Sequence, residues 1–180
     1  MTKRYEHLLQ AIREKQPTAI MEIGVWNGMR ALSMLNLAPK AKYYGFDLFE
    51  DATAQTDKEE LNSKPHNAMQ TVWDRLTGFD VALVKGNTRE TLPLFNEPVD
   101  FVFIDGGHSV ETIRSDWENV KRVIVPGARV FFDDYLTATP IDYSSLWGCN
   151  AVVKDLRHEV LPSKDWLKGG GHTQIVMVWP

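Results

Sequence analysis

The sequence predicts an α/β fold with a mostly parallel sheet and helices on both of its faces. Short apolar segments alternate with segments of helical periodicity along nearly the whole chain of 180 residues, as in parallel sheets that are buried on both sides. In residues 19–28, an apolar run leads to Glu22, Gly24 and Gly28 before a helical pattern starts. This segment predicts a strand, a tight turn and a helix. Open α/β sheets bind nucleotide-like ligands at such a turn.

Seven strands are expected, with helices between them. Strands are predicted at residues 18–22, 42–47, 80–85, 99–104, 129–132, 161–166 and 174–179, the last one antiparallel. Helices are predicted at residues 3–15, 28–37, 65–78, 109–124 and 149–158, with a short one after Thr88 and a turn at 126–127. Residues 48–64 and 135–148 are expected to form long loops beside the carboxyl ends of the second and fifth strands.

Length, charge and composition narrow the classes of function. The chain is long enough for one domain with a full core, expected over residues 1–180. A net charge of −4 without a basic stripe argues against a nucleic-acid partner. The single Cys149 excludes an internal disulfide and suits a reducing compartment. Because the N-terminus is polar and no apolar run could span a bilayer, we expect a cytoplasmic protein without a membrane association.

The glycine turn does not match the dinucleotide fingerprint, which would place glycines at Glu22 and Asn27 when aligned on Gly24. The pattern E-x-G-x-x-x-G instead resembles motif I of the class I S-adenosylmethionine-dependent methyltransferases. The resemblance covers residues 18–180 and implies a Rossmann-like fold whose last strand is antiparallel. It implies that Glu22, Gly24 and Gly28 bind the cofactor, with Gly24 leaving room for its methionine part and Glu22 reaching its ammonium group. A strand–helix turn without a ligand is the alternative.

Three further residues are candidate cofactor contacts. Asp47 ends the second strand, and an acid about 20 residues beyond the glycine turn can accept hydrogen bonds from both ribose hydroxyls. Leu48 is expected to line the adenine pocket, with a place in the core as the alternative. Asn87 follows the third strand and has two interpretations: it hydrogen-bonds the adenine edge, or it caps the helix that starts at Thr88.

Acidic residues follow two neighbouring strands. Asp105 ends the fourth strand, with His108 three residues later, and Asp133 and Asp134 end the fifth. Neighbouring parallel strands deliver their ends to one place, so these four side chains should converge beside the cofactor. Three carboxylates repel each other unless a cation lies among them, and hard divalent cations take oxygen ligands. The sequence therefore predicts a Mg²⁺ or Mn²⁺ site at Asp105, Asp133 and Asp134; Asp105 could instead contact only the cofactor.

The pattern D-x-x-H followed by D-D resembles the metal-dependent sugar O-methyltransferases of macrolide biosynthesis, of the mycinamicin and macrocin type. This resemblance implies that the three acids bind Mg²⁺ and that His108 is the general base. The expected reaction is O-methylation of a small hydroxylated substrate, such as a sugar or a polyketide-linked sugar. A metal-independent methyltransferase for another acceptor and a non-catalytic S-adenosylmethionine-binding domain are the alternatives. The acceptor stays open, and so does the oligomeric state, for which a homodimer is one option.

Overall fold

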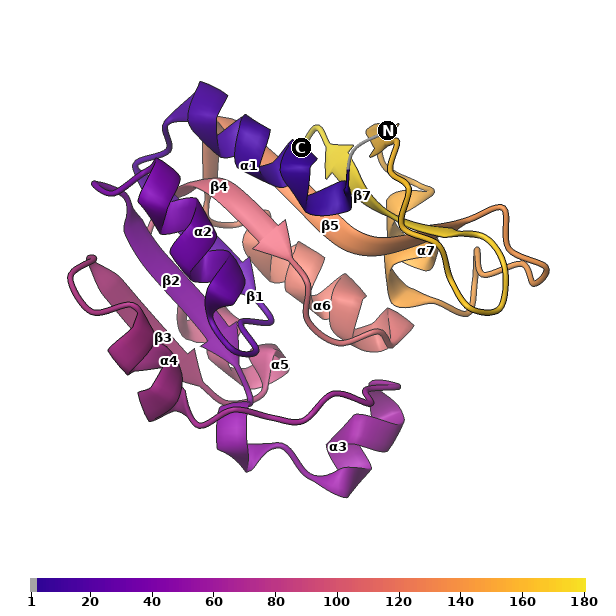
Figure 1. Cartoon of the computed structure of the whole chain (residues 1–180), viewed down its shortest axis with the longest axis horizontal. Helices are drawn as coiled ribbons and strands as arrows, with labels where there is room; N and C mark the ends of the chain where they lie inside the picture. The colour runs from indigo at the N-terminus through magenta and orange to yellow at the C-terminus, as the bar shows by residue number, and fades with distance from the viewer. Residues whose placement is uncertain (1–2) are drawn as a thin grey trace.

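The computed structural model describes residues 3–180, so the first two residues of the expected domain lie outside it. Its strands are β1 (Ala19–Ile23), β2 (Lys42–Asp47), β3 (Val81–Lys85), β4 (Val99–Ile104), β5 (Ile124–Thr137), β6 (His158–Leu161) and β7 (His172–Val178). They form one seven-stranded sheet in the order β3-β2-β1-β4-β5-β7-β6 (Figure 1). The strands from β3 to β5 in this order pair in parallel, whereas β7 is antiparallel to β5 and β6. The predicted fold class is therefore confirmed.

Helices cover both faces of this sheet. They are α1 (Arg4–Lys15), α2 (Met29–Leu37), α3 (Ala54–Glu59), α4 (Met69–Arg75), α5 (Thr88–Thr91), α6 (Val110–Val120) and α7 (Gly148–Val153), with short 3₁₀ turns η1 (Phe49–Asp51) and η2 (Leu92–Leu94). Buried residues of α1, α2 and α4 share one apolar cluster, and those of α6 and α7 share the other. Figure 1 shows the first group in front of the sheet and α6 behind it. None of the helices in residues 3–180 combines the length and apolar composition needed to cross a bilayer.

The central strand β4 shows how the sheet separates the two clusters. Its side chains alternate between the faces, as the pleat of a strand requires. Phe101 and Phe103 belong to the cluster under α1 and α2, whereas Val102 and Ile104 belong to the cluster under α6 and α7. Burial of each such side chain stabilises the fold by roughly 1.5–3 kcal/mol. Strand β4 is therefore packed on both faces, and this packing fixes the position of its carboxyl end.

Strand β5 differs most from the sequence prediction, which gave it only residues 129–132 after a turn at 126–127. The turn is an irregularity inside the strand, because the pairing with β4 shifts between Val99 and Phe101 and Gly127 adopts a φ of 80°. At its other end, β5 continues to Thr137 and pairs with β7. The predicted loop over residues 135–148 is therefore shorter than expected. A single-sequence pattern could not reveal this extension, because it depends on hydrogen bonds to β7.

Several other helices and strands also begin or end at residues that differ from the sequence prediction. The predicted loop over residues 48–64 contains η1 and α3, and α3 begins with a capping box in which Thr53 and Thr56 bond each other's backbone. The usual signature of that box has Glu or Gln at the fourth position, which is why the helix was missed. The helix predicted over residues 149–158 ends at Val153, and the strand expected at 161–166 lies earlier, as β6. The segment from η1 to α4 passes across the edge of the sheet where β1, β2 and β4 end (Figure 1).

Candidate active site

A cavity of about 350 Å³ lies where the parallel strands end, between the glycine turn and the α3 segment. This is within the size range of small-molecule sites, which is about 300–1,000 Å³. Most of the residues predicted to bind the cofactor line this cavity, together with the predicted base: Glu22, Gly24, Asp47, Leu48, Asn87, Asp105 and His108. Residues of α3 and of the segment after it also line the cavity, and they belong to the long loop predicted over residues 48–64. Gly28 is absent from the lining.

The two glycines of the turn have different roles. Gly24 has a φ of 88°, and a Cβ at this position would overlap the backbone carbonyl of Asp105. The glycine thus allows the end of β1 to lie directly against the end of β4. Gly28 has a φ of 73°, and a Cβ there would lie 2.8 Å from the side chain of Val72 in α4. Gly28 therefore allows the start of α2 to lie close to Val72 of α4, and its direct contact with the cofactor stays a prediction.

Glu22 is a fully buried acid in the wall of the cavity. The Tyr43 hydroxyl donates a hydrogen bond to its Oε2, while its Oε1 is buried and has no partner in the described part of the chain. Burial raises the pKa of Glu22 to about 8, although the Tyr43 hydrogen bond and the charge of Arg30 act in the opposite direction. An unpaired buried acceptor is costly. A ligand with an N–H donor would satisfy it, as the predicted ammonium contact requires.

Asp47 holds the turn and the next loop together. Its Oδ2 accepts hydrogen bonds from the backbone N–H groups of Val25 and Trp26, each at 2.7 Å, and its Oδ1 accepts one from Phe49 at 2.8 Å. Trp26 and Phe49 both have φ values near 50°, which is unusual for residues other than glycine. A carboxylate has about four acceptor positions, so the predicted ribose contact would share Asp47 with this backbone framework.

Another part of the large cavity is lined by Asn87 and Leu48. The Asn87 side chain accepts a hydrogen bond from the Arg89 backbone at 3.0 Å and so caps α5. The capping interpretation of Asn87 is thus confirmed. Its amide nitrogen donates no hydrogen bond within residues 3–180, so the contact with an adenine edge stays a prediction. Leu48 lines the same cavity, as expected.

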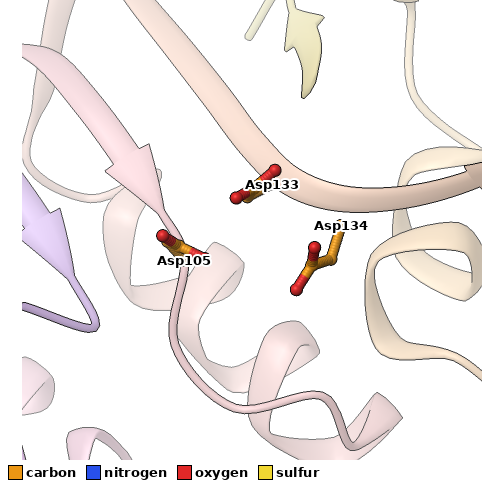
Figure 2. A group of neighbouring side chains, drawn as sticks. All are labelled: Asp105, Asp133 and Asp134. Carbon is orange, nitrogen blue, oxygen red and sulfur yellow. The ribbon is translucent and has the colours of Figure 1, made fainter. Parts of the chain in front are cut away.

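The predicted acid cluster is present (Figure 2). Asp105 follows β4, whereas Asp133 and Asp134 lie in β5, and one carboxylate oxygen of each lies within 4.8 Å of the others. These three residues, with His108, line a second cavity of about 10 Å³. That space is close to the volume that holds one water molecule. The segment from Asp105 to His108 lines both cavities and forms the wall between them.

A β-bulge aims both aspartates of β5 at the same space. Successive residues of a regular strand point to opposite faces. Here the pairing with β7 shifts between Phe132 and Tyr135, whose partners are Val176 and Gln174. Two residues of β5, Asp133 and Asp134, therefore lie opposite one residue of β7, and Asp134 has a φ of 56°. A bulge is a common device for redirecting a side chain near a functional site. Figure 2 shows the resulting carboxylates facing a common space with Asp105.

The electrostatics of the cluster differ from one acid to the next. Burial, together with neighbouring negative charge, raises the pKa of Asp105 and of Asp133. Burial also opposes ionisation of Asp134, but the hydrogen bond from His108 and the charge of Arg4 outweigh it and lower the pKa of Asp134. The Oδ1 atom of Asp133 is buried and finds no partner among residues 3–180. Carboxylate oxygens with one acceptor left unpaired match the ligand preference of Mg²⁺ or Mn²⁺.

His108 lies between the two cavities with both ring nitrogens engaged. Its Nδ1 lies 2.9 Å from the carbonyl oxygen of Glu60, which can only accept, so Nδ1 carries a proton. Its Nε2 lies 3.0 Å from Oδ2 of Asp134. Burial lowers the pKa of His108, but the hydrogen bond and charge of Asp134 more than compensate, so the net pKa is raised. The Trp147 ring stacks on the imidazole at a centroid distance of 4.5 Å.

Glu60 is a site residue that the sequence analysis missed. Its carboxylate accepts hydrogen bonds from the Ser109 backbone, the Ser109 hydroxyl and the Thr112 hydroxyl, and so attaches the α3 segment to the start of α6. Its backbone carbonyl orients His108. No local signal distinguishes Glu60 from the other acids of this polar segment. Its role arises from a contact with residues about fifty positions later in the chain.

Two basic residues from the helices were also missed. Arg4 pairs with Asp133 and Asp134, at 3.2 and 3.0 Å. Arg30 lines the large cavity, lies over the Tyr5 ring and forms no salt bridge within residues 3–180. No motif marks these basic residues in the sequence, because α1 and α2 read as ordinary amphipathic helices.

The aromatic residues at and after the end of β5 form only part of a wall beside the acid cluster. Trp147 contacts both His108 and Tyr143, and its indole N–H donates to the carbonyl of Asp134 at 2.8 Å. Tyr135 lies apart from them, against His158. Trp147 thus supports the acid cluster, and a wall built from all three aromatic residues is not present.

The fold is the Rossmann-like fold of methyltransferases, and a comparison with protein families gives the class of this protein. Residues 21–135 match a protein family described as a methyltransferase domain. Because this match covers more than half of the chain, the protein belongs to that family, and the prediction of a methyltransferase is confirmed. No curated protein matches the sequence.

Solved structures agree in fold. The O-methyltransferase TomG from Streptomyces achromogenes, solved in complex with SAM, is 17% identical, with a TM-score of 0.65 over 96% of this chain and 78% of that chain. An O-methyltransferase from Bacillus cereus, in complex with SAH, is 16% identical, with a TM-score of 0.66 over 97% of this chain and 80% of that chain. Identities this low show a shared fold and leave the substrate open.

Glu22 should make the stability of the fold depend on pH. Between its ordinary pKa of 4.5 and its folded pKa of about 8, the folded state keeps a proton that the unfolded state has lost. Stability therefore falls as pH rises through this window. We expect the melting temperature of the wild type to fall relative to that of Glu22→Gln between pH 5 and 8. The exposed Glu97→Gln is the matched control, and parallel melting curves for wild type and Glu22→Gln would contradict this assignment.

Proposed function

We propose that this protein is an S-adenosylmethionine-dependent O-methyltransferase that uses a divalent cation, Mg²⁺ or Mn²⁺. Its acceptor would be a small hydroxylated molecule, such as a sugar or a polyketide-linked sugar. The observation that carries this proposal is the shared wall between the two cavities: Asp105 and His108 face both a cofactor-sized space and the acid cluster. This arrangement supports a reaction in which His108 acts between a methyl donor and a metal-bound hydroxyl.

Several features of the large cavity support S-adenosylmethionine as the donor. The unpaired Oε1 of Glu22 suits its ammonium group, and the guanidinium of Arg30, which has no salt-bridge partner within residues 3–180, suits its carboxylate. The close backbone approach at Gly24 leaves the turn open to the methionine part. Asp47 remains the candidate for the ribose. Two of the structures with this fold were solved with SAM or SAH.

In the proposed reaction, Asp105, Asp133 and Asp134 hold the cation. When bound, the cation supplies a lowered pKa for a coordinated hydroxyl of the acceptor. His108 accepts the hydroxyl proton at Nε2, because the carbonyl of Glu60 keeps Nδ1 protonated. That step would require Nε2 to leave Asp134 and first to give up the proton that it shares with this carboxylate, so that His108 is neutral when it acts. The chain's other contribution is to hold donor and acceptor in line, and the α3 segment excludes water from the cavity.

One observation favours the metal-independent alternative. The Arg4 guanidinium already brings a positive charge to Asp133 and Asp134. If that charge is sufficient, His108 could act on a hydroxyl without a cation. The metal-dependent and the metal-independent reaction differ in whether a chelator stops methyl transfer.

The cofactor assignment predicts selective stabilisation. S-Adenosylhomocysteine should raise the melting temperature, because a ligand at 100 times its Kd stabilises a fold by about 2.7 kcal/mol. NAD should have no effect, since the turn lacks the dinucleotide fingerprint. Thermal unfolding with each ligand is the measurement. Stabilisation by NAD and not by S-adenosylhomocysteine would contradict the proposed donor.

The metal and the base predict two separate losses of activity. Methyl transfer to a panel of sugars and polyketide-linked sugars, followed by mass spectrometry, should stop in EDTA and return with Mg²⁺ or Mn²⁺. His108→Ala should bind S-adenosylhomocysteine yet lose roughly 10²–10⁴-fold in rate, the usual contribution of a general base. The loss should shrink at high pH, where the hydroxyl ionises without help. His158→Ala, on the edge strand β6, is the control.

Each result has a distinct meaning. Full activity in EDTA with a defective His108→Ala would support the metal-independent methyltransferase. Full activity in both experiments would show that the acid cluster and His108 are structural.

A further inference from the structure

We propose that Arg4 and Tyr5 of α1 are positioning residues of the metal site. Together they would hold one oxygen of Asp133 and one oxygen of Asp134, so that the other oxygen of each carboxylate is presented to the cation. This inference rests on the metal-dependent form of the proposed function. It assigns a role to a helix that lies outside the matched methyltransferase region, which begins at residue 21.

The contacts of α1 all fall on one oxygen of each aspartate. The Tyr5 hydroxyl donates to Oδ2 of Asp133 at 2.7 Å, and Nη2 of Arg4 lies 3.2 Å from the same atom. Nη1 of Arg4 donates to Oδ1 of Asp134 at 3.0 Å, where the Thr173 hydroxyl donates as well, at 2.9 Å. We call these two acceptors, Oδ2 of Asp133 and Oδ1 of Asp134, the outer oxygens.

The remaining oxygens have few partners. Among residues 3–180, Oδ1 of Asp133 is buried without a partner, and Oδ2 of Asp134 has the His108 ring as its one hydrogen-bond partner. The Asp105 carboxylate accepts no hydrogen bond from residues 3–180. These oxygens belong to the acid cluster in which one oxygen from each residue lies within 4.8 Å of the others. A cation among them would supply the partner that Oδ1 of Asp133 lacks.

Arg4 could either support the ligands of the cation or occupy the site of the cation itself, and the oxygens that it contacts distinguish these two roles. If Arg4 occupied the site of the cation, it would contact the unpaired oxygens, and a metal would have to displace it. It contacts the outer oxygens instead, as the hydrogen-bonded supports of metal-ligating carboxylates do. The charges also agree, because one guanidinium and one divalent cation balance three carboxylates.

The two side chains are themselves held in place. The Arg4 backbone N–H donates to Asp165 at 2.7 Å, and its guanidinium donates to Thr173 at 2.6 Å and to the Tyr5 hydroxyl at 2.7 Å. The Tyr5 ring packs edge-on against Phe103 of β4. α1 thus links β4 and β7 to the two acids of β5. A fixed support of this kind can hold the ligands in one geometry before the cation arrives.

The test measures Mn²⁺ binding by the electron paramagnetic resonance signal of free Mn²⁺, in the presence of S-adenosylhomocysteine. Arg4→Met and Tyr5→Phe should each weaken Mn²⁺ binding by about 10–100-fold, the usual effect of removing such a support. Arg4→Lys should restore part of the loss, because it keeps the charge and loses the planar fork. Arg13→Met, an exposed residue in the last turn of the same helix, should bind Mn²⁺ like the wild type.

Tyr5→Phe removes only a hydroxyl, so it tests the inference even if Arg4→Met folds poorly. Unchanged or tighter Mn²⁺ binding in Tyr5→Phe and in folded Arg4→Met would overturn the inference, and tighter binding would identify Arg4 as a competitor of the cation. If the wild type binds no Mn²⁺, the metal requirement of the proposed function fails and this inference fails with it.

Discussion

Electrostatic repulsion among three carboxylates is the main physical constraint on this structure. Two like charges about 4 Å apart repel by roughly 4 kcal/mol at an effective dielectric constant of about 20. Three such pairs are comparable to the whole free energy of unfolding of a domain, about 5–15 kcal/mol. Nevertheless, one carboxylate oxygen from each of Asp105, Asp133 and Asp134 lies within 4.8 Å of the other two. Burial, followed by the neighbouring negative charge, raises the pKa of Asp105 and of Asp133, so both acids favour the protonated form when no cation balances their charge.

The backbone and the neighbouring elements make this arrangement possible. The bulge in β5 directs two consecutive acids into one space, and the stacked Trp147 holds the carbonyl of Asp134. Gly24 lets the end of β1 touch the end of β4, which brings the predicted cofactor turn against Asp105. The same short segment from Asp105 to His108 therefore borders both cavities. In the proposed reaction, this shared wall is what places the methyl donor beside the activated hydroxyl.

Much of this site could be predicted from sequence because it follows from topology. Apolar runs located β1, β2 and β4, and the rule that parallel strands end together brought Asp105, His108, Asp133 and Asp134 to one place. The bulge could not be predicted, because it depends on the register of β7, a strand some forty residues later. Arg4 contacts Asp134 across 130 positions of sequence, and Glu60 is one acid among several in a polar segment. Neither has a local pattern that marks its partner.

The central claim is that Asp105, Asp133 and Asp134 hold a divalent cation beside the cofactor. A crystal grown with Mn²⁺ and S-adenosylhomocysteine, measured at the manganese absorption edge, tests it most directly. The account predicts an anomalous peak among the three carboxylates, at oxygen distances of roughly 2.0–2.3 Å, with Arg4 still on the outer oxygens. A map with S-adenosylhomocysteine bound and no manganese peak among these residues would contradict it.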